Sequence, residues 1–165
     1  FLFANPGSAL GSGSATAFCH GDGTATACPC GNSSTTGGCA NGTSDGATLS
    51  ASGSASLAND TLILMGSGLI ASQPGLYFQG NNAVNSGNGN NFGDGLRCAG
   101  GGVIRLQVRF ADPSGTSATS IDIATKGGAT PGDVKRYQVW YRNPNTTPCG
   151  SNFNLSNGYE LTWEV

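Results

Sequence analysis

The chain has 165 residues, which suits one domain. Only 10% of the residues are charged, and the formal net charge is −2 with no long run of either sign. Nucleic-acid binding and a polybasic membrane-surface segment are therefore disfavoured, because both need clustered cations. No stretch approaches the roughly 20 apolar residues of a transmembrane helix.

Residues 1–17 are expected to form an extended N-terminal arm. Phe1, Leu2 and Phe3 are apolar, and the Gly/Ser/Ala-rich stretch 7–17 is typical of a flexible linker. The start lacks the basic and long apolar regions of a signal peptide, so we expect a processed end or part of a longer chain. An apolar tip on a tether must be buried, either on its own domain or on a neighbouring subunit.

Residues 18–46 are expected to form a disulfide-rich loop segment, because Cys, Gly, Asn and Thr dominate and no periodicity appears. The chain has six cysteines, an even number that predicts disulfides and secretion to an oxidising compartment, outside the cell or at its surface. They are Cys19, Cys28, Cys30, Cys39, Cys98 and Cys149. Two bridges are expected among the first four, and the third between Cys98 and Cys149. A zinc site is the alternative, but the C-x-C spacing and the single histidine, His20, disfavour it.

From residue 47 onward, the pattern predicts β-strands. They are expected at 47–57, 60–65, 75–79, 102–110, 120–124, 134–142 and 159–165, with a Gly/Asn loop at 81–91. The strongest alternation places three sets of side chains on buried faces. These are Ile104, Leu106, Val108 and Phe110; Tyr137, Val139 and Tyr141; and Tyr159, Leu161, Trp163 and Val165. No helical period is sustained. The predicted fold is all-β, an antiparallel, jelly-roll-like β-sandwich spanning residues 18–165.

No catalytic constellation stands out, and the expectation is a protein that is not an enzyme. His20 with Asp22 lacks a plausible nucleophile nearby. The only glutamates, Glu160 and Glu164, fall on the polar side of the last strand, where cross-strand ion pairs with arginines are the simpler interpretation. No cofactor or metal is expected.

Three further motifs suggest binding or modification. Gly21-Asp22-Gly23 and Gly93-Asp94-Gly95 resemble pieces of calcium loops, although isolated Asp-Gly pairs are usually turns. Trp140, on the polar face of its strand, is a candidate for stacking on sugar rings, and it can equally pack under a loop or against another subunit. Glycosylation sequons occur at Asn32, Asn41, Asn59, Asn145 and Asn154, which makes a glycoprotein a possibility.

Several motifs together resemble a family of uncharacterised secreted Cys/Gly-rich β-domain proteins of planctomycete-like bacteria. They are FCHGDG (18–23), CPCGN (28–32), ASLANDTL (55–62), LYFQG (76–80), FGDGLRC (92–98), YQVWYR (137–142) and FNLSN (153–157). The resemblance covers about residues 18–165 and leaves out the arm. It implies secretion and disulfides, and it supplies no catalytic residue.

Two functions follow as hypotheses. The first is a self-assembling filament or surface-layer subunit, in which Phe1, Leu2 and Phe3 complete the sheet of the next copy in a homopolymer. The second is a secreted carbohydrate-binding or adhesion module that uses Trp140.

Overall fold

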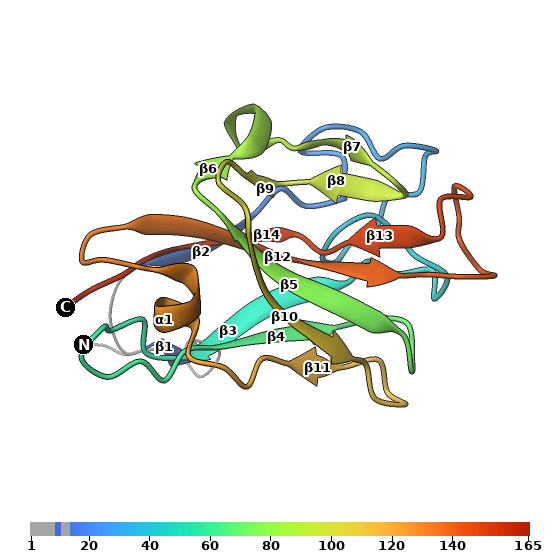
Figure 1. Ribbon diagram of the computed structural model, residues 1–165. Helices are drawn as coiled ribbons and strands as arrows, with labels where there is room; N and C mark the ends of the chain where they lie inside the picture. The colour runs from blue at the N-terminus through green and yellow to red at the C-terminus, as the bar shows by residue number, and fades with distance from the viewer. Residues whose placement is uncertain (1–8, 11–13) are drawn as a thin grey trace.

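Two sheets face each other across the main hydrophobic core of the computed structural model, which describes residues 9–10 and 14–165 (Figure 1). The first sheet has the order β1 (Ala9–Leu10), β3 (Thr48–Gly53), β4 (Ile63–Ser67) and β11 (Ser117–Ala118). The second has the order β10 (Ile104–Phe110), β5 (Pro74–Gly80), β12 (Val134–Arg142), β14 (Gly158–Thr162) and β2 (Ala15–Phe18), with β13 (Phe153–Leu155) beside β12. All strand pairs are antiparallel except β1 with β3. The predicted all-β sandwich is confirmed.

The main core follows from the period-two pattern of the long strands. Tyr137, Val139 and Tyr141 on β12 are buried between the sheets, as predicted, together with Leu161 and Trp163 from the C-terminal region. The first sheet contributes small and branched side chains, because its strands are rich in Ala, Ser and Leu. The large aromatic side chains of the second sheet pack against the small residues of the first sheet, and together they fill the space between two twisted sheets.

A third layer covers part of the outer face of the second sheet, and the sequence did not predict it. In Figure 1 the short strands β6 (Asn82–Ala83), β7 (Asn90–Phe92), β8 (Gly95–Arg97) and β9 (Ala99–Gly100) lie above the second sheet, with the 3₁₀ turn η1 (Val84–Gly87) at one end. They form two small hairpin-like pairs, β6 with β9 and β7 with β8. Phe78, Ala99 and Leu155 are buried between this layer and the sheet.

The side chain of Gln138 joins the third layer to the sheet. It is fully buried, and its Oε1 accepts hydrogen bonds from the main-chain N–H groups of Cys98 (2.8 Å) and Ala99 (3.1 Å). Its Nε2 donates to the carbonyls of Leu96 (3.0 Å) and Ser156 (2.7 Å). One amide therefore satisfies four backbone groups from the third layer and the loop before β14.

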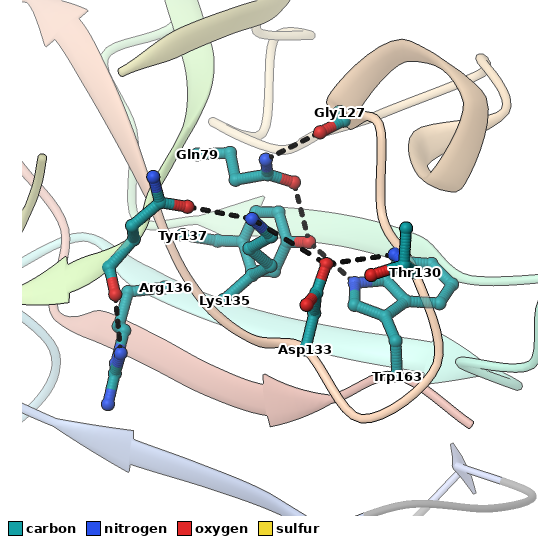
Figure 2. A network of polar contacts seen from close by, with 9 residues as sticks. Gln79, Gly127, Thr130, Asp133, Lys135, Arg136, Tyr137 and Trp163 are labelled. Carbon is teal, nitrogen blue, oxygen red and sulfur yellow. Dashed lines mark hydrogen bonds and ion pairs between the residues drawn. The ribbon is translucent and has the colours of Figure 1, made fainter. Parts of the chain in front are cut away.

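A second polar network fixes the short helix α1 (Ile123–Gly127) against the sandwich (Figure 2). The Tyr137 hydroxyl donates to Gln79 Oε1 (2.9 Å) and accepts from the Trp163 indole N–H (3.0 Å). Gln79 Nε2 in turn donates to the carbonyl of Gly127 at the end of α1 (3.0 Å). Burial raises the pKa of the Tyr137 phenol well above its ordinary value, so the hydroxyl stays a neutral donor.

All six cysteines form disulfides, but the pairing differs from the expected one. The bridges are Cys19–Cys98, Cys28–Cys39 and Cys30–Cys149. One local bridge is therefore correct, and the expected Cys98–Cys149 bridge is wrong. Cys98 lies on the connection from β8 to β9, next to the start of the cysteine-rich segment, whereas Cys149 lies in the loop after β12. The two long-range bridges tie the residue 18–46 segment to two different parts of the chain.

Two predictions about individual strands were wrong. Residues 120–124 contribute to α1, because Asp122 caps the helix by accepting from the N–H of Thr125 and Gly128 ends it in the left-handed conformation. A β-bulge between Arg105 and Gln107 inverts the alternation of β10, so Val108 and Phe110 are 56% and 67% exposed.

The chain ends also differ from expectation. Val165 is 80% exposed, so the last buried side chain is Trp163. At the N-terminal end, β2 begins at Ala15, inside the range expected to be an arm, and β1 pairs with β3 of the same chain. Phe1, Leu2 and Phe3 lie outside the described residues. In the described part of the chain, no helix is long and apolar enough to cross a membrane.

We predict that Gln138→Leu lowers the free energy of unfolding by about 3–5 kcal/mol. The substitution leaves four buried backbone groups without a hydrogen-bond partner and changes the side-chain volume little. Gln107→Leu is the matched control. Its amide bonds only the exposed Ser120, so we expect a loss below about 1 kcal/mol. Chemical denaturation of both variants measures the difference. Equal losses would show that Gln138 does not hold the third layer.

Candidate functional site

The candidate site lies on the outer face of the second sheet, where the third layer stops. Two adjoining hollows of about 200 and 260 Å³ open there, and Leu76 of β5 and Trp140 of β12 line both of them. Phe78 and Leu155 line the first hollow, and Pro74 and Val108 line the second. The two hollows therefore form one largely apolar surface, which we call the Trp140 face.

Three aromatic rings form the centre of the Trp140 face. Phe92 of β7, Trp140 and Phe153 of β13 are in mutual contact, with centroid separations of 5.6 Å (Phe92–Trp140), 5.7 Å (Trp140–Phe153) and 5.1 Å (Phe92–Phe153). All three pairs are tilted or edge-to-face, which is the favoured arrangement of aromatic quadrupoles. The contacts with Phe92 and Phe153 hold the indole of Trp140 in place, and the residue is still partly exposed.

The turn between β7 and β8 fixes the position of Phe153. Gly93 has a φ of +59°, and a Cβ there would lie 2.2 Å from a carbon of the Phe153 ring, so the ring needs a glycine beneath it. Asp94 is completely buried. Its carboxylate accepts from the Thr147 hydroxyl (2.5 Å) and the Ser151 N–H (3.1 Å). The Gly93-Asp94-Gly95 motif thus joins the turn between β7 and β8 to the loop before β13, and we call Asp94 the clamp between them.

Three arginines border the Trp140 face. Arg97 of β8 and Arg105 of β10 line the first hollow, and Arg142 at the end of β12 lines the second. The Arg97 guanidinium carbon lies 6.0 Å from the Phe92 centroid, and its Nε donates to the carbonyl of Ala99 (3.3 Å). Among the described residues, neither Arg105 nor Arg142 has a hydrogen-bond or ion-pair partner through its side chain. The apolar surface therefore carries unused cationic donors at both ends.

The β10 bulge is part of this site. Because the bulge inverts the alternation, Val108 pairs with Leu76 and lies on the same side of the sheet as Trp140. Regular alternation would have placed a polar residue there.

On the opposite side of the sheet, burial raises the pKa of the Tyr141 phenol well above its ordinary value, and its hydroxyl accepts a hydrogen bond from Asn41 (2.9 Å).

The structure does not bring the other predicted site residues together into a catalytic group. Asp22 is exposed and accepts from the N–H and hydroxyl of Thr24, which lowers the pKa of its carboxyl. No hydrogen bond links it to His20. Glu160 accepts from Arg136 Nε at 2.7 Å, the expected cross-strand ion pair, and Glu164 is exposed. In the part of the chain that the structure describes, no cluster of three or more His, Cys, Asp or Glu side chains is placed to hold a metal ion.

One pair of carboxylates was missed by sequence reasoning. Asp60 accepts from the Ala124 N–H (2.9 Å) while Asp122 accepts from Thr125, so both serve the first turn of α1. Burial raises the pKa of Asp60, whereas the hydrogen bonds from Thr125 and Asp60 lower that of Asp122. These contacts give the pair a structural role as helix caps.

The five sequons divide by accessibility. Asn59 and Asn145 are exposed. The side-chain nitrogens of the other three donate hydrogen bonds within the fold. Asn32 donates to Ala40 and Asp94; Asn41 to Gly68 and the Tyr141 hydroxyl; and Asn154 to Cys39 and Ala40. In the folded protein, the nitrogens of Asn32, Asn41 and Asn154 are thus engaged in hydrogen bonds, and modification of the five sequons stays a prediction.

Sequence reasoning identified Trp140 but missed its surroundings. Phe92, Phe153 and the three arginines come from five different strands, and they meet only where the third layer borders the second sheet. The one available signal was that each aromatic lies close to a Gly- and Asn-rich turn.

Comparison of the chain with known protein families, with curated protein sequences and with solved structures gave no match.

We predict that Asp94→Ala lowers the free energy of unfolding by about 2–3 kcal/mol, because the partly buried Thr147 hydroxyl and the Ser151 N–H lose their acceptor. Asp22→Ala removes the other Gly-Asp-Gly carboxylate, which is exposed, and we expect a much smaller loss. Thermal denaturation of the two variants makes the comparison. If Asp22→Ala were the more damaging change, Asp94 would not be the clamp.

Proposed function

We propose that this protein is an extracellular carbohydrate-binding module and that the sugar stacks on Trp140. The observation that carries the proposal is the rigid, partly exposed indole between two apolar hollows. A concave, mostly apolar surface with a few convergent polar groups is the usual form of a small-ligand site.

The chemistry of a pyranose ring fits this surface. Its axial C–H groups make an apolar face that packs on an aromatic ring, while its hydroxyls need hydrogen bonds at the edge. The Trp140 face offers the indole as the platform and the arginine side chains as edge donors. Because Phe92 and Phe153 hold the indole in place, binding costs little side-chain entropy.

An extracellular location is supported by the three disulfides. They use all six cysteines of the chain, and such bridges persist mainly in oxidising compartments. A domain with few charges and many turns gains stability from cross-links that close long loops.

Trp140→Ala is expected to weaken polysaccharide binding by about tenfold, because the stacking platform is lost. Affinity gel electrophoresis against neutral and acidic plant, algal and bacterial polysaccharides measures the retardation. Phe110→Ala removes an exposed aromatic side chain that lies outside both hollows, and it should leave binding unchanged. Trp140→Phe keeps most of the ring packing and tests whether a loss reflects misfolding.

Two results would contradict the carbohydrate proposal. One is the absence of retardation by every polysaccharide. The other is unchanged retardation of a folded Trp140→Ala variant.

Self-association is a second candidate function, favoured by the exposed edge of the second sheet. β10 is the outermost strand there, and Phe110 and Val108 on it are more than half exposed. Strand addition along such an edge is a known route to polymers. The bulge and the two arginines of β10 are features that oppose such pairing, which is why we rank this function second.

If the protein forms a homopolymer through its edge and its N-terminal residues, the native chain should sediment as large species. Deleting residues 1–6, or introducing Phe110→Ser, should then shift it towards the monomer. Sedimentation velocity over a range of concentrations measures this. A native chain that stays monomeric at the highest concentration would contradict self-assembly, and assembly that survives the deletion would exclude a role of Phe1, Leu2 and Phe3.

A further inference from the structure

We propose that the ligand of the Trp140 face is an acidic polysaccharide, whose sugar units carry carboxylate or sulfate groups. This inference rests on the proposed carbohydrate-binding function and adds the chemical class of the sugar. Carboxylate and sulfate share the chemistry that matters here: each is an anion with two or more oxygens, repeated along the polymer.

The first observation is the local balance of charge. The chain has seven cationic and nine acidic side chains, yet three of the seven cations border this one face. The described residues that line the two hollows include no Asp or Glu. The surface is thus positive although the whole chain is formally negative, and charge complementarity selects an anion.

The second observation is that these cations are free to bind. Elsewhere on the sheet, Arg136 is paired with Glu160 (2.7 Å) and Lys135 lies 3.8 Å from Asp133. Arg105 and Arg142 are exposed residues, and among the described residues their side chains have no hydrogen-bond or ion-pair partner. Arg97 uses its Nε for the Ala99 carbonyl, which leaves its terminal nitrogens unused.

The third observation is the arrangement around the indole. Arg97 and Arg105 border the hollow on one side of Trp140, and Arg142 borders the hollow on the other side. A sugar stacked on the indole therefore has a cation at both ends, which suits a polymer with a charge on each unit. Arginine forms two parallel hydrogen bonds with carboxylate or sulfate, and the apolar floor strengthens them by excluding water.

The experiment is calorimetric titration of the full chain with matched charged and neutral polymers. Polygalacturonate is compared with its fully methyl-esterified form, and a sulfated galactan with the same galactan after desulfation. At about 50 mM salt we expect each charged polymer to bind about tenfold more tightly than its neutral partner. We also expect this advantage to shrink strongly at about 500 mM salt through screening. The stronger of the two charged polymers identifies the anionic group.

Variants test whether the arginines cause the preference. Arg105→Gln and Arg142→Gln should each weaken binding of the charged polymer about three- to tenfold and leave the neutral polymer unaffected. Lys126→Gln on α1 removes the same charge at an exposed residue outside both hollows, and no change is expected. Thermal denaturation confirms that each variant is folded.

The outcomes separate the two proposals. Equal binding of charged and neutral polymers, or arginine variants that behave like Lys126→Gln, would overturn the acidic ligand and leave carbohydrate binding intact. Binding of none of the polymers would overturn both. Equally tight binding of single-stranded DNA at the same salt would overturn the polysaccharide class, because simple charge attraction would then explain the affinity.

Discussion

Buried side-chain amides hold this fold together wherever the chain leaves its two main sheets. A loop laid over a sheet carries main-chain N–H and C=O groups that must find partners once water is excluded. Gln138 supplies four such partners, and Asn157, in the loop before β14, joins that loop to Leu49 of β3 by accepting from its N–H and donating to its carbonyl. In the described part of the chain, every buried side-chain nitrogen and oxygen has a hydrogen bond. The disulfides then fix the loops that the amides have docked.

This arrangement explains how a chain rich in glycine and asparagine makes a binding surface. The third layer covers only part of the second sheet, so its border exposes apolar side chains that a complete cover would bury. Trp140 lies at that border, between Phe92 of the layer and Phe153 of the adjoining strand. Asp94 ties the border to the loop before β13. The groups that stabilise the fold are therefore the same groups that position the aromatic platform.

The strands were predictable where one face is apolar and the other polar. Residues 134–142 match β12, and Tyr137, Val139 and Tyr141 are buried as their alternation indicates. The alternation did not show that the other face is also partly buried. Gln138 looks like a solvent residue in the sequence, because nothing local reveals the four backbone groups that surround it. The β10 bulge and the disulfide pairing depend in the same way on contacts between distant segments.

The candidate site was predictable only through Trp140. A tryptophan on the polar face of an alternating strand indicates either a binding platform or a covered contact, and the structure shows a partly covered one. The arginines gave a weaker signal, because Arg105 and Arg142 alternate with apolar residues as any surface charge does. Their shared border appears only when β10, β12 and the third layer are assembled.

The central claim is that ligand binds at the uncovered border of the third layer. The most direct test is the ¹H–¹⁵N spectrum of the two tryptophan indoles during titration with polygalacturonate, since the chain has only Trp140 and Trp163. We predict that the Trp140 indole signal shifts progressively until the protein is saturated. The Trp163 indole is buried and hydrogen-bonded to Tyr137, so its signal should not shift. An unmoved Trp140 signal at saturating polymer, or a shift of Trp163 alone, would contradict the account.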